Sequence, residues 1–246
     1  MPYTYEYPRP ALTADVAVFT IRTGDLSVLL IRRAKAPFKG AWALPGGFVD
    51  LNEPLEKAAA RELSEETGLG GLPMEQLGAF GDPGRDPRGH VVSVAWLAFL
   101  VAARPVTAGD DASAAQWHSV AALPKMAFDH ALVIQVALDR LRHRLVDPGR
   151  SPIEIVPPRF TLSELQHVHE AVLGRQVDKR NFRARLLAKN LVEPVGAARK
   201  LGRHRPAQLY RFVGAPERPV RDEETVKIRT THATPKAARA RAKRVR

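Results

Sequence analysis

Residues 47–69 read GFVDLNEPLEKAAARELSEETGL, and this stretch decides the fold of the first part of the chain. Its apolar residues recur at helical spacing, at Leu55, Ala58, Ala59 and Leu63. Gly68 stands where such a helix would end. We therefore predict a helix from Leu55 to Thr67 that follows a tight, glycine-containing loop.

The predicted helix carries three glutamates that lie close together. Glu62 and Glu66 are four residues apart and project from one face, with Glu65 at its edge. A solvated acidic face is the usual explanation of such a cluster. Alternatively, a divalent cation neutralises the carboxylates, and oxygen ligands favour Mg²⁺ or Mn²⁺. Gly46 lets the loop approach closely and could offer its backbone carbonyl as a further ligand.

The same stretch resembles the Nudix box, G-x5-E-x7-R-E-U-x-E-E-x-G-U, in which U is apolar. A chance match at all fixed positions has a probability on the order of one in a billion. The resemblance favours the metal site and implies an α/β/α sandwich with a mixed sheet. It implies that Glu62, Glu65 and Glu66 bind metal and, with Arg61, form the catalytic set of a hydrolase that cleaves a diphosphate linked to another group. We expect Arg61 to pair with Glu53. The matching residues are Gly47, Glu53, Arg61, Glu62, Leu63, Glu65, Glu66, Gly68 and Leu69.

Strand and helix patterns alternate around this helix. Residues 15–22 and 27–33 form β-rich runs around Gly24, which is typical of a hairpin. Further strands are expected at residues 90–101 and 115–120, and Asp129 is expected to cap a helix that ends near Leu145. We therefore predict a mixed α/β first domain over residues 10–147.

The loop from Phe80 to His90 resembles that of Nudix proteins that act on or sense ADP-ribose. The resemblance implies that Phe80, Arg85 and Arg88 bind substrate, because basic side chains can meet a diphosphate. Plain surface arginines are an equally weighted alternative. ADP-ribose or a related nucleotide is the expected ligand, with NADH, a nucleotide sugar or a damaged nucleoside triphosphate left open.

The general base is not assigned by the sequence. Asp110 and Asp111 follow a late strand, where many Nudix enzymes carry the base, but a glutamate common in related loops is missing here. Glu65 is the alternative. Histidines 118, 130, 167 and 169 are expected to be surface or capping residues rather than metal ligands or proton shuttles.

Composition separates the chain into two parts. Residues 1–150 contain 16 basic and 17 acidic residues, a net charge of −1, whereas residues 151–246 contain 22 and 9, a net charge of +13. Such asymmetry predicts a module that binds a polyanion, with nucleic acid favoured over an acidic membrane surface. The chain has no cysteine and no apolar run long enough to cross a bilayer, so a cytoplasmic protein without a membrane partner is expected.

The basic part begins after a turn-rich linker at residues 147–152. A capping box between Thr161 and Glu164, with Phe160 and Leu165 at the positions of a hydrophobic staple, predicts a helix over residues 162–173. Asp178 can cap a second helix over residues 179–190. On this second helix, Phe182, Leu186 and Leu187 are expected to face inward, and Lys179, Arg180, Arg183 and Lys189 outward.

Short strands at residues 191–195 and 208–212 surround a turn rich in glycine and arginine. This order predicts a small winged helix-turn-helix over residues 153–213 and a basic, disordered tail over residues 214–246. A solvated basic face is the alternative to DNA binding. The residues expected to contact DNA are Lys179, Arg180, Arg183, Arg203 and Arg205.

Residues 10–213 together resemble the Nudix-related transcriptional regulators of NAD metabolism. This resemblance implies a homodimer that grips a palindromic double-stranded DNA operator and senses ADP-ribose or a related metabolite. Many members of that family have lost part of the box, whereas this chain keeps all of it. Hydrolysis is therefore expected beside regulation. A stand-alone, Mg²⁺-dependent ADP-ribose pyrophosphatase with a nonspecific basic anchor remains the alternative.

Overall fold

The computed structural model describes residues 6–109, 112–146, 156–199 and 207–213. Several expectations lie outside these residues: the candidate bases Asp110 and Asp111, the linker, the wing residues Arg203 and Arg205, and the tail. No helix in the described ranges is long and apolar enough to span a membrane.

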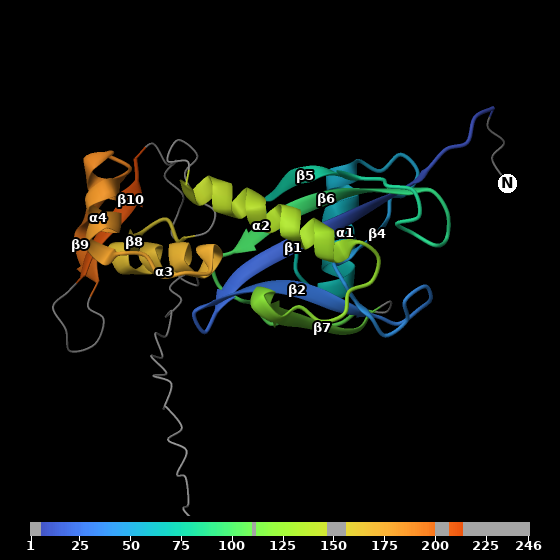
Figure 1. Ribbon diagram of the computed structural model, residues 1–246, viewed down its shortest axis with the longest axis horizontal. Helices are drawn as coiled ribbons and strands as arrows, with labels where there is room; N and C mark the ends of the chain where they lie inside the picture. Colours follow the sequence, from blue (N-terminus) through green and yellow to red (C-terminus); the bar gives the residue numbers. More distant parts are fainter. Residues whose placement is uncertain (1–5, 110–111, 147–155, 200–206, 214–246) are drawn as a thin grey trace, which may run out of the picture.

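A mixed sheet of seven strands forms the centre of the first domain (Figure 1). β1 pairs in parallel with β6 and antiparallel with β2 and β4, and the predicted hairpin is confirmed with Gly24 in its turn at φ 91°. The strands are β1 (Ala11–Arg22), β2 (Asp25–Arg33), β3 (Trp42–Ala43), β4 (Gly46–Phe48), β5 (Met74–Phe80), β6 (Val91–Leu100) and β7 (Ala112–Ser119).

Three of these strands were not expected from the sequence. β5 is an edge strand that contains Glu75, Gln76 and Gly78, so its composition gives a weak strand signal. β3 and β4 are too short to show a period of two. β7 begins at Ala112, three residues before the predicted strand.

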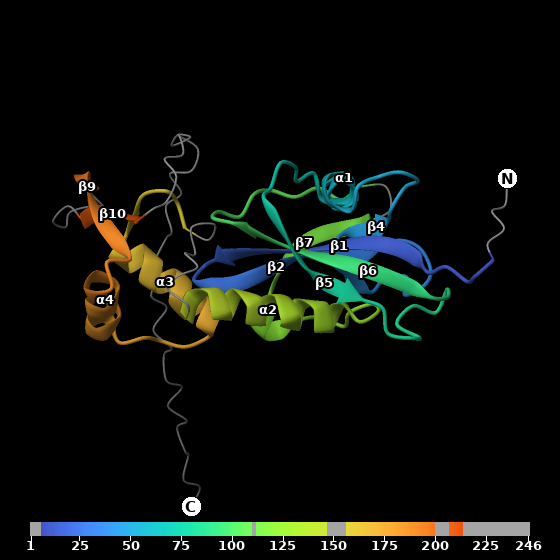
Figure 2. The same cartoon turned by 90° about the horizontal axis from the view of Figure 1, so that it is seen from above.

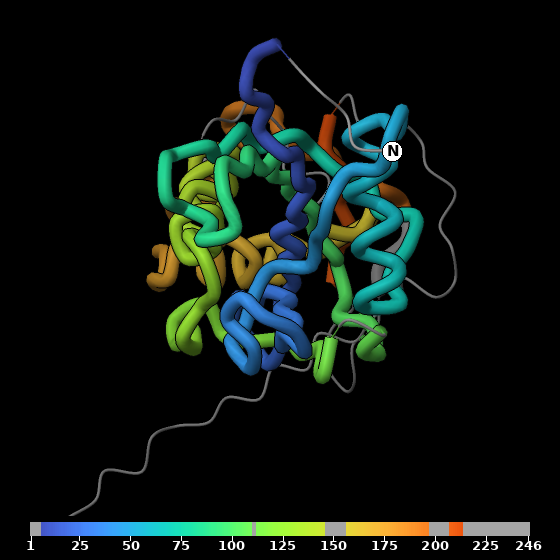
Figure 3. Tube along the Cα trace, turned by 90° about the vertical axis from the view of Figure 1, so that its right-hand side faces the viewer, coloured from blue at the N-terminus to red at the C-terminus, as the bar shows by residue number. Residues whose placement is uncertain are grey.

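Helices cover both faces of the sheet, which confirms the α/β/α sandwich. α1 (Leu55–Thr67) and α2 (His130–Val146) lie on opposite sides of the strands in Figures 2 and 3. α1 has the predicted bounds, and Gly68 ends it in the left-handed conformation at φ 72°. A short 3-10 helix, η1 (Val120–Ala122), follows β7.

The C-terminal module has the predicted helix-turn-helix order and a small sheet of order β8-β10-β9. The capping box is confirmed: Glu164 N donates to Thr161 Oγ1 at 3.1 Å, and Thr161 N donates to Glu164 Oε2 at 2.7 Å. Asp178 Oδ1 accepts from Asn181 N at 2.8 Å and caps the second helix as predicted. The elements are β8 (Phe160–Thr161), α3 (Leu162–Leu173), α4 (Lys179–Ala188), β9 (Val192–Arg199) and β10 (Ala207–Phe212).

The details of α4 differ from the prediction. It ends two residues early, at Ala188, and β9 continues to Arg199 through residues expected in the wing turn. Leu187 is 46% exposed, so it does not belong to the inward face. The inward expectation for Leu187 was wrong: of the predicted inward residues of α4, only Phe182 and Leu186 pack in the core cluster.

The two modules share a continuous apolar core. Buried α2 residues such as Leu138 and Leu141 belong to the same cluster as Leu165 and Val172 of α3. Arg142 of α2 also donates from Nε to the Val172 carbonyl at 3.5 Å. The C-terminal module therefore uses α2, which also covers the seven-stranded sheet, as a packing partner.

We expect the full chain to unfold cooperatively and a fragment of residues 152–246 to lack this transition, because without α2 the apolar surface of α3 is exposed to water. Thermal unfolding followed by far-ultraviolet circular dichroism measures this. A sharp, reversible transition in the isolated fragment would contradict the shared core.

Candidate functional site

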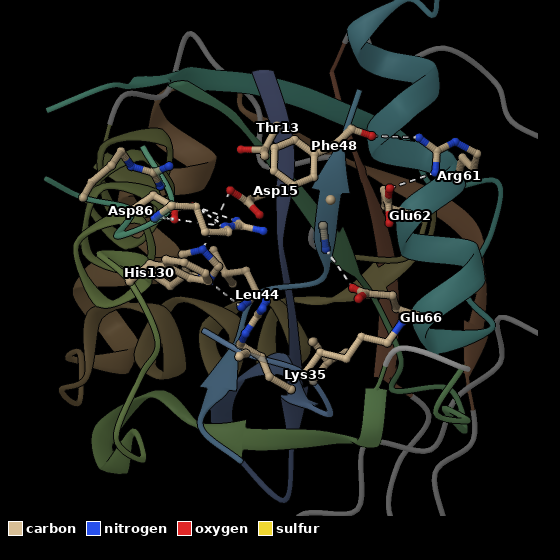
Figure 4. A pocket seen from close by; sticks show the side chains of 18 of the residues that line it. Thr13, Asp15, Lys35, Leu44, Phe48, Arg61, Glu62, Glu66, Asp86 and His130 are labelled. Atoms are coloured by element: carbon tan, nitrogen blue, oxygen red, sulfur yellow. Dashed lines mark hydrogen bonds and ion pairs between the residues drawn. The ribbon is translucent and has the colours of Figure 1, made fainter. Parts of the chain in front are cut away.

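A cavity of about 390 Å³ opens between β4, helix α1 and the loop around Arg85 to Arg88 (Figure 4). Its walls come from β1, β2, β4, α1, the loop around Arg85 to Arg88 and the start of α2. The cavity thus brings the box helix together with the loop that the sequence singled out for ligand binding.

Two glycines let β4 lie close to its neighbours, Gly46 to β1 and Gly47 to α1. A Cβ on Gly46 would overlap the Ala14 carbonyl oxygen, and one on Gly47 would overlap the Glu62 carboxylate. Gly46 N donates to Glu66 Oε2 at 2.9 Å, which ties strand β4 to the helix. Gly46 therefore contacts the box through its amide, and the predicted carbonyl ligation stays a prediction.

Arg61 braces the loop against the helix, as the sequence predicted. Its Nε and Nη2 donate to the two carboxylate oxygens of Glu53 at 2.9 and 2.8 Å, and Nη2 also reaches the Phe48 carbonyl at 3.1 Å. The hydrogen bonds from Arg61 lower the pKa of Glu53 to about 2. Nη1 donates to Glu62 at 2.8 Å and to Glu65 at 3.3 Å.

The three box glutamates do not converge equally. Glu62 and Glu66 line the cavity, whereas the Glu65 side chain is 60% exposed and lies beside Arg61. Within the described residues, no three acidic or histidine side chains form a ready metal cluster. The paired carboxylates of Glu62 and Glu66 still fit a hard divalent cation, since carboxylate oxygens are the ligands such ions prefer.

Burial has a clear effect on Glu66. Desolvation raises its pKa to about 7, with smaller contributions in the same direction from Glu62 and Asp15, while the hydrogen bond from Gly46 and the charge of Arg33 oppose the shift. A carboxylate held in this position would be stabilised by a nearby cation.

A buried polar group that the sequence did not indicate lies across the cavity. Ser93 Oγ donates to Asp15 Oδ2, and His130 Nδ1 accepts from Leu44 N at 2.9 Å. In the neutral ring the proton is therefore on Nε2, which faces Asp15 Oδ2 at 3.8 Å. Asp15 and His130 gave no motif, because only the sheet brings them together.

Two histidine expectations were wrong. His130 is 4% exposed and His169 is 9% exposed, so neither is a surface residue. His169 packs edge-on to Phe182, with Nδ1 at 3.0 Å from the Leu165 carbonyl. Burial lowers the pKa of both rings, so the neutral forms are favoured.

The predicted substrate residues have different positions. Arg85 and Arg88 line the cavity, but each is paired: Arg85 with Asp129 at 2.6 and 2.9 Å, and Arg88 with Asp86 at 2.6 Å. The Arg85 side chain is only 5% exposed. Phe80 packs against the core cluster and is not among the residues that line the cavity.

Arg33 is a further cavity residue that sequence reasoning missed. Its Nε donates to the Pro37 carbonyl at 2.8 Å, and its guanidinium lies 5.0 Å from the Phe128 ring centroid. Within the described part of the chain it makes no ion pair, in contrast to Arg61, Arg85 and Arg88. Burial, and then the charge of Arg88, lower its pKa. Its place at the end of a buried strand was the available signal.

The second candidate site is the exposed surface of α4. Lys179 and Arg180 are exposed, as expected for residues that contact DNA. Arg183 is half-buried, and its Nη2 donates to Ser163 Oγ at 2.9 Å. The expectation that Arg183 faces outward was therefore wrong, because the first turn of α3 offers it an acceptor.

Residues 11–137 match the model of the NUDIX domain, and residues 152–212 match that of the NrtR DNA-binding winged helix domain. The chain is 38% identical over 211 residues to an ADPR responsive transcriptional repressor NtrR from Acinetobacter baylyi, covering 84% of each protein. The chain belongs to the NrtR family of Nudix proteins.

Two further proteins are similar to this chain, one over most of its length and one over about half of it. The crystal structure of Shewanella oneidensis NrtR complexed with a 27mer DNA matches with a TM-score of 0.64 and 35% identity, over 82% of this chain and 93% of that one. An ADP-ribose pyrophosphatase from Methanocaldococcus jannaschii is 46% identical over 120 residues, which are 49% of this chain and 70% of that protein. The cavity of this NrtR-family chain lies within residues 11–137, the part that matches the NUDIX domain.

Glu66 should make the stability of the metal-free protein depend on pH. Its folded-state pKa of about 7 exceeds the ordinary value of 4.5, so stability should fall as pH rises between these values. We expect Glu66→Gln to raise the free energy of unfolding at pH 8 by at most roughly 3 kcal/mol, and to have little effect near pH 4. Urea unfolding with a chelator present measures the difference.

Glu65→Gln is the matched control, because it removes the same charge from an exposed position. Equal stabilisation by both substitutions would show that general repulsion on the helix, rather than burial of Glu66, is responsible.

Proposed function

We propose that this chain is a metabolite-responsive transcriptional regulator that binds ADP-ribose, or a related nucleoside diphosphate derivative, in the Nudix cavity and double-stranded DNA through its winged helix. The main support is that one cavity contains carboxylates of the Nudix box together with arginine guanidinium groups. The same chain also has a basic helix, α4. The similarity to the ADPR responsive repressor supports the same ligand.

The cavity offers complementary groups for such a ligand. Arg33 has terminal nitrogens without a carboxylate partner in the described structure, and guanidinium groups bind diphosphate oxygens well. Phe48 and Phe128 line the same space, and aromatic rings can stack on a base. The Arg88 guanidinium carbon lies 4.8 Å from the centroid of the Phe48 ring and is also close to the Phe128 ring, so its charge is near both aromatic groups. We therefore propose Arg33 as a diphosphate-binding residue, with Arg88 beside it.

Hydrolysis is the second activity that the site supports. Glu62 and Glu66 would hold Mg²⁺ or Mn²⁺, with Glu65 at the exposed edge. When bound, such a cation neutralises charge on the diphosphate and lowers the pKa of an attacking water. Arg61 keeps Glu62 in place through its hydrogen bond of 2.8 Å. The pyrophosphatase from M. jannaschii supports ADP-ribose as the substrate.

Regulation requires that ligand and DNA binding influence each other. We propose a homodimer whose two winged helices grip a palindromic operator near genes of NAD metabolism, and which acts in the cytoplasm. The similarity to NrtR complexed with DNA supports the DNA partner. Ligand would alter DNA affinity by favouring one arrangement of the two winged helices.

The primary test measures ADP-ribose hydrolysis with Mg²⁺ or Mn²⁺ and a DNA mobility shift on the gene's own upstream region. We expect release of AMP and ribose 5-phosphate, loss of this release in Glu66→Gln, and a specific shift that ADP-ribose changes. Hydrolysis without a shift would leave a pyrophosphatase with a basic appendage. Equal shifts with scrambled DNA would rule out an operator-specific regulator.

Arg33→Ala should weaken ADP-ribose binding at least about tenfold, because it removes charge-assisted hydrogen bonds to the diphosphate. Isothermal calorimetry with Glu66→Gln as the background avoids turnover. Arg32→Ala is the control, since Arg32 is the adjacent, exposed arginine and its Nε donates to the Gly40 carbonyl. Equal effects of the two substitutions would show that Arg33 does not bind the ligand.

A further inference from the structure

Helix α4 has two different faces. Phe182 and Leu186 pack into the core of the winged module. Arg180, Asn181 and Ala184 are exposed and lie on the opposite side of the helix, within its first two turns. Both Figure 1 and Figure 2 place α4 at the end of the molecule away from the Nudix sheet, where a duplex could reach it.

Arg183 does not belong to the exposed face. Its Nη2 donates to Ser163 Oγ at 2.9 Å, and its Nε is buried without a hydrogen-bond partner in the described structure. Ser163 lies in the first turn of α3, so this contact joins the two helices of the helix-turn-helix. The contact therefore restricts the angle between α3 and α4, and with it the angle at which α4 would meet DNA.

The exposed face has the chemistry of base recognition. The Asn181 backbone is already capped by Asp178, and its side chain is exposed. An asparagine amide can bind both adenine N6 and N7, and an arginine can bind guanine O6 and N7. Ala184, one turn after Arg180, is small enough to let the helix approach the groove closely, and its methyl group can contact a thymine methyl.

We propose that Asn181 and Arg180 read bases in the major groove, and that Arg183 is a positioning residue that acts through Ser163 rather than a residue that contacts DNA. This inference rests on the proposed DNA-binding function. It separates two residues of α4 that specify a sequence, Arg180 and Asn181, from Arg183, which holds the helix in place.

The first test selects double-stranded DNA from a random library with the full-length wild-type protein and with Asn181→Ala. We expect the wild type to select a defined sequence with an adenine that Asn181→Ala no longer selects. Arg180→Ala should relax a guanine position in the same way. Arg104→Ala, which removes an exposed arginine from the Nudix domain, should select the wild-type sequence.

The second test compares Arg183→Ala and Ser163→Ala on the selected DNA. Each should weaken binding about tenfold, since a hydrogen bond to a charged group is lost. The double variant should bind no more weakly than Arg183→Ala, because the two residues act through one contact. The base preference should stay as in the wild type, and so should the slope of log affinity against log salt. Circular dichroism checks that each variant is folded. If Arg183→Ala does not fold, Ser163→Ala alone still tests the contact.

The outcomes separate the inference from the function on which it rests. A wild-type protein that selects no sequence would overturn the proposed function and this inference with it. A selective wild type whose preference survives both Asn181→Ala and Arg180→Ala would overturn the base-reading assignment alone. A salt slope smaller by about 0.9 in Arg183→Ala would show a direct phosphate contact and overturn the positioning role.

Discussion

The approach of the Gly46-Gly47 backbone to the carboxylates of α1 is the constraint on which the Nudix site depends. β4 must pair with β1 on one side while Glu62 and Glu66 reach it from the other. A Cβ on Gly46 would overlap the backbone of β1, so this position requires glycine, whereas a Cβ on Gly47 would displace the Glu62 carboxylate. Arg61 then fixes the loop by bonding to Glu53 and the Phe48 carbonyl. The site is therefore held by hydrogen bonds within the box itself, before any ligand binds.

Among the described arginines of the cavity, Arg61, Arg85 and Arg88 are paired with carboxylates and Arg33 is not. Buried charges are costly unless they have partners, and Arg85 and Arg88 have carboxylates at hydrogen-bond distance. Arg33 contacts a carbonyl and an aromatic ring instead. Glu66 faces the same space with a raised pKa. A ligand with a diphosphate, together with a divalent cation, would complement these two groups of opposite charge.

α2 contacts both functional regions. At its start, Asp129 holds Arg85 and His130 accepts from the Leu44 amide, so its position is fixed by cavity residues. Towards its end it packs against α3 and bonds to the Val172 carbonyl. Since α3 in turn contacts Arg183 of α4, packed side chains connect the cavity with the exposed face of the winged helix.

The sequence alone determined the features that depend on local chemistry. Three features follow from residues near one another in the chain: helix α1 with its Gly68 end, the N-terminal caps of α3 and α4, and the Glu53–Arg61 pair. Edge strand β5 was missed because its composition is polar, and Leu187 was misplaced because periodicity does not show how much core lies below a helix. Only the tertiary structure decided that Asp15, Arg33, Phe128 and His130 share a cavity with Glu66, and that Arg183 turns toward Ser163. These contacts join residues far apart in the chain, and the packing of the sheet, α1 and α2 fixes the distances between them.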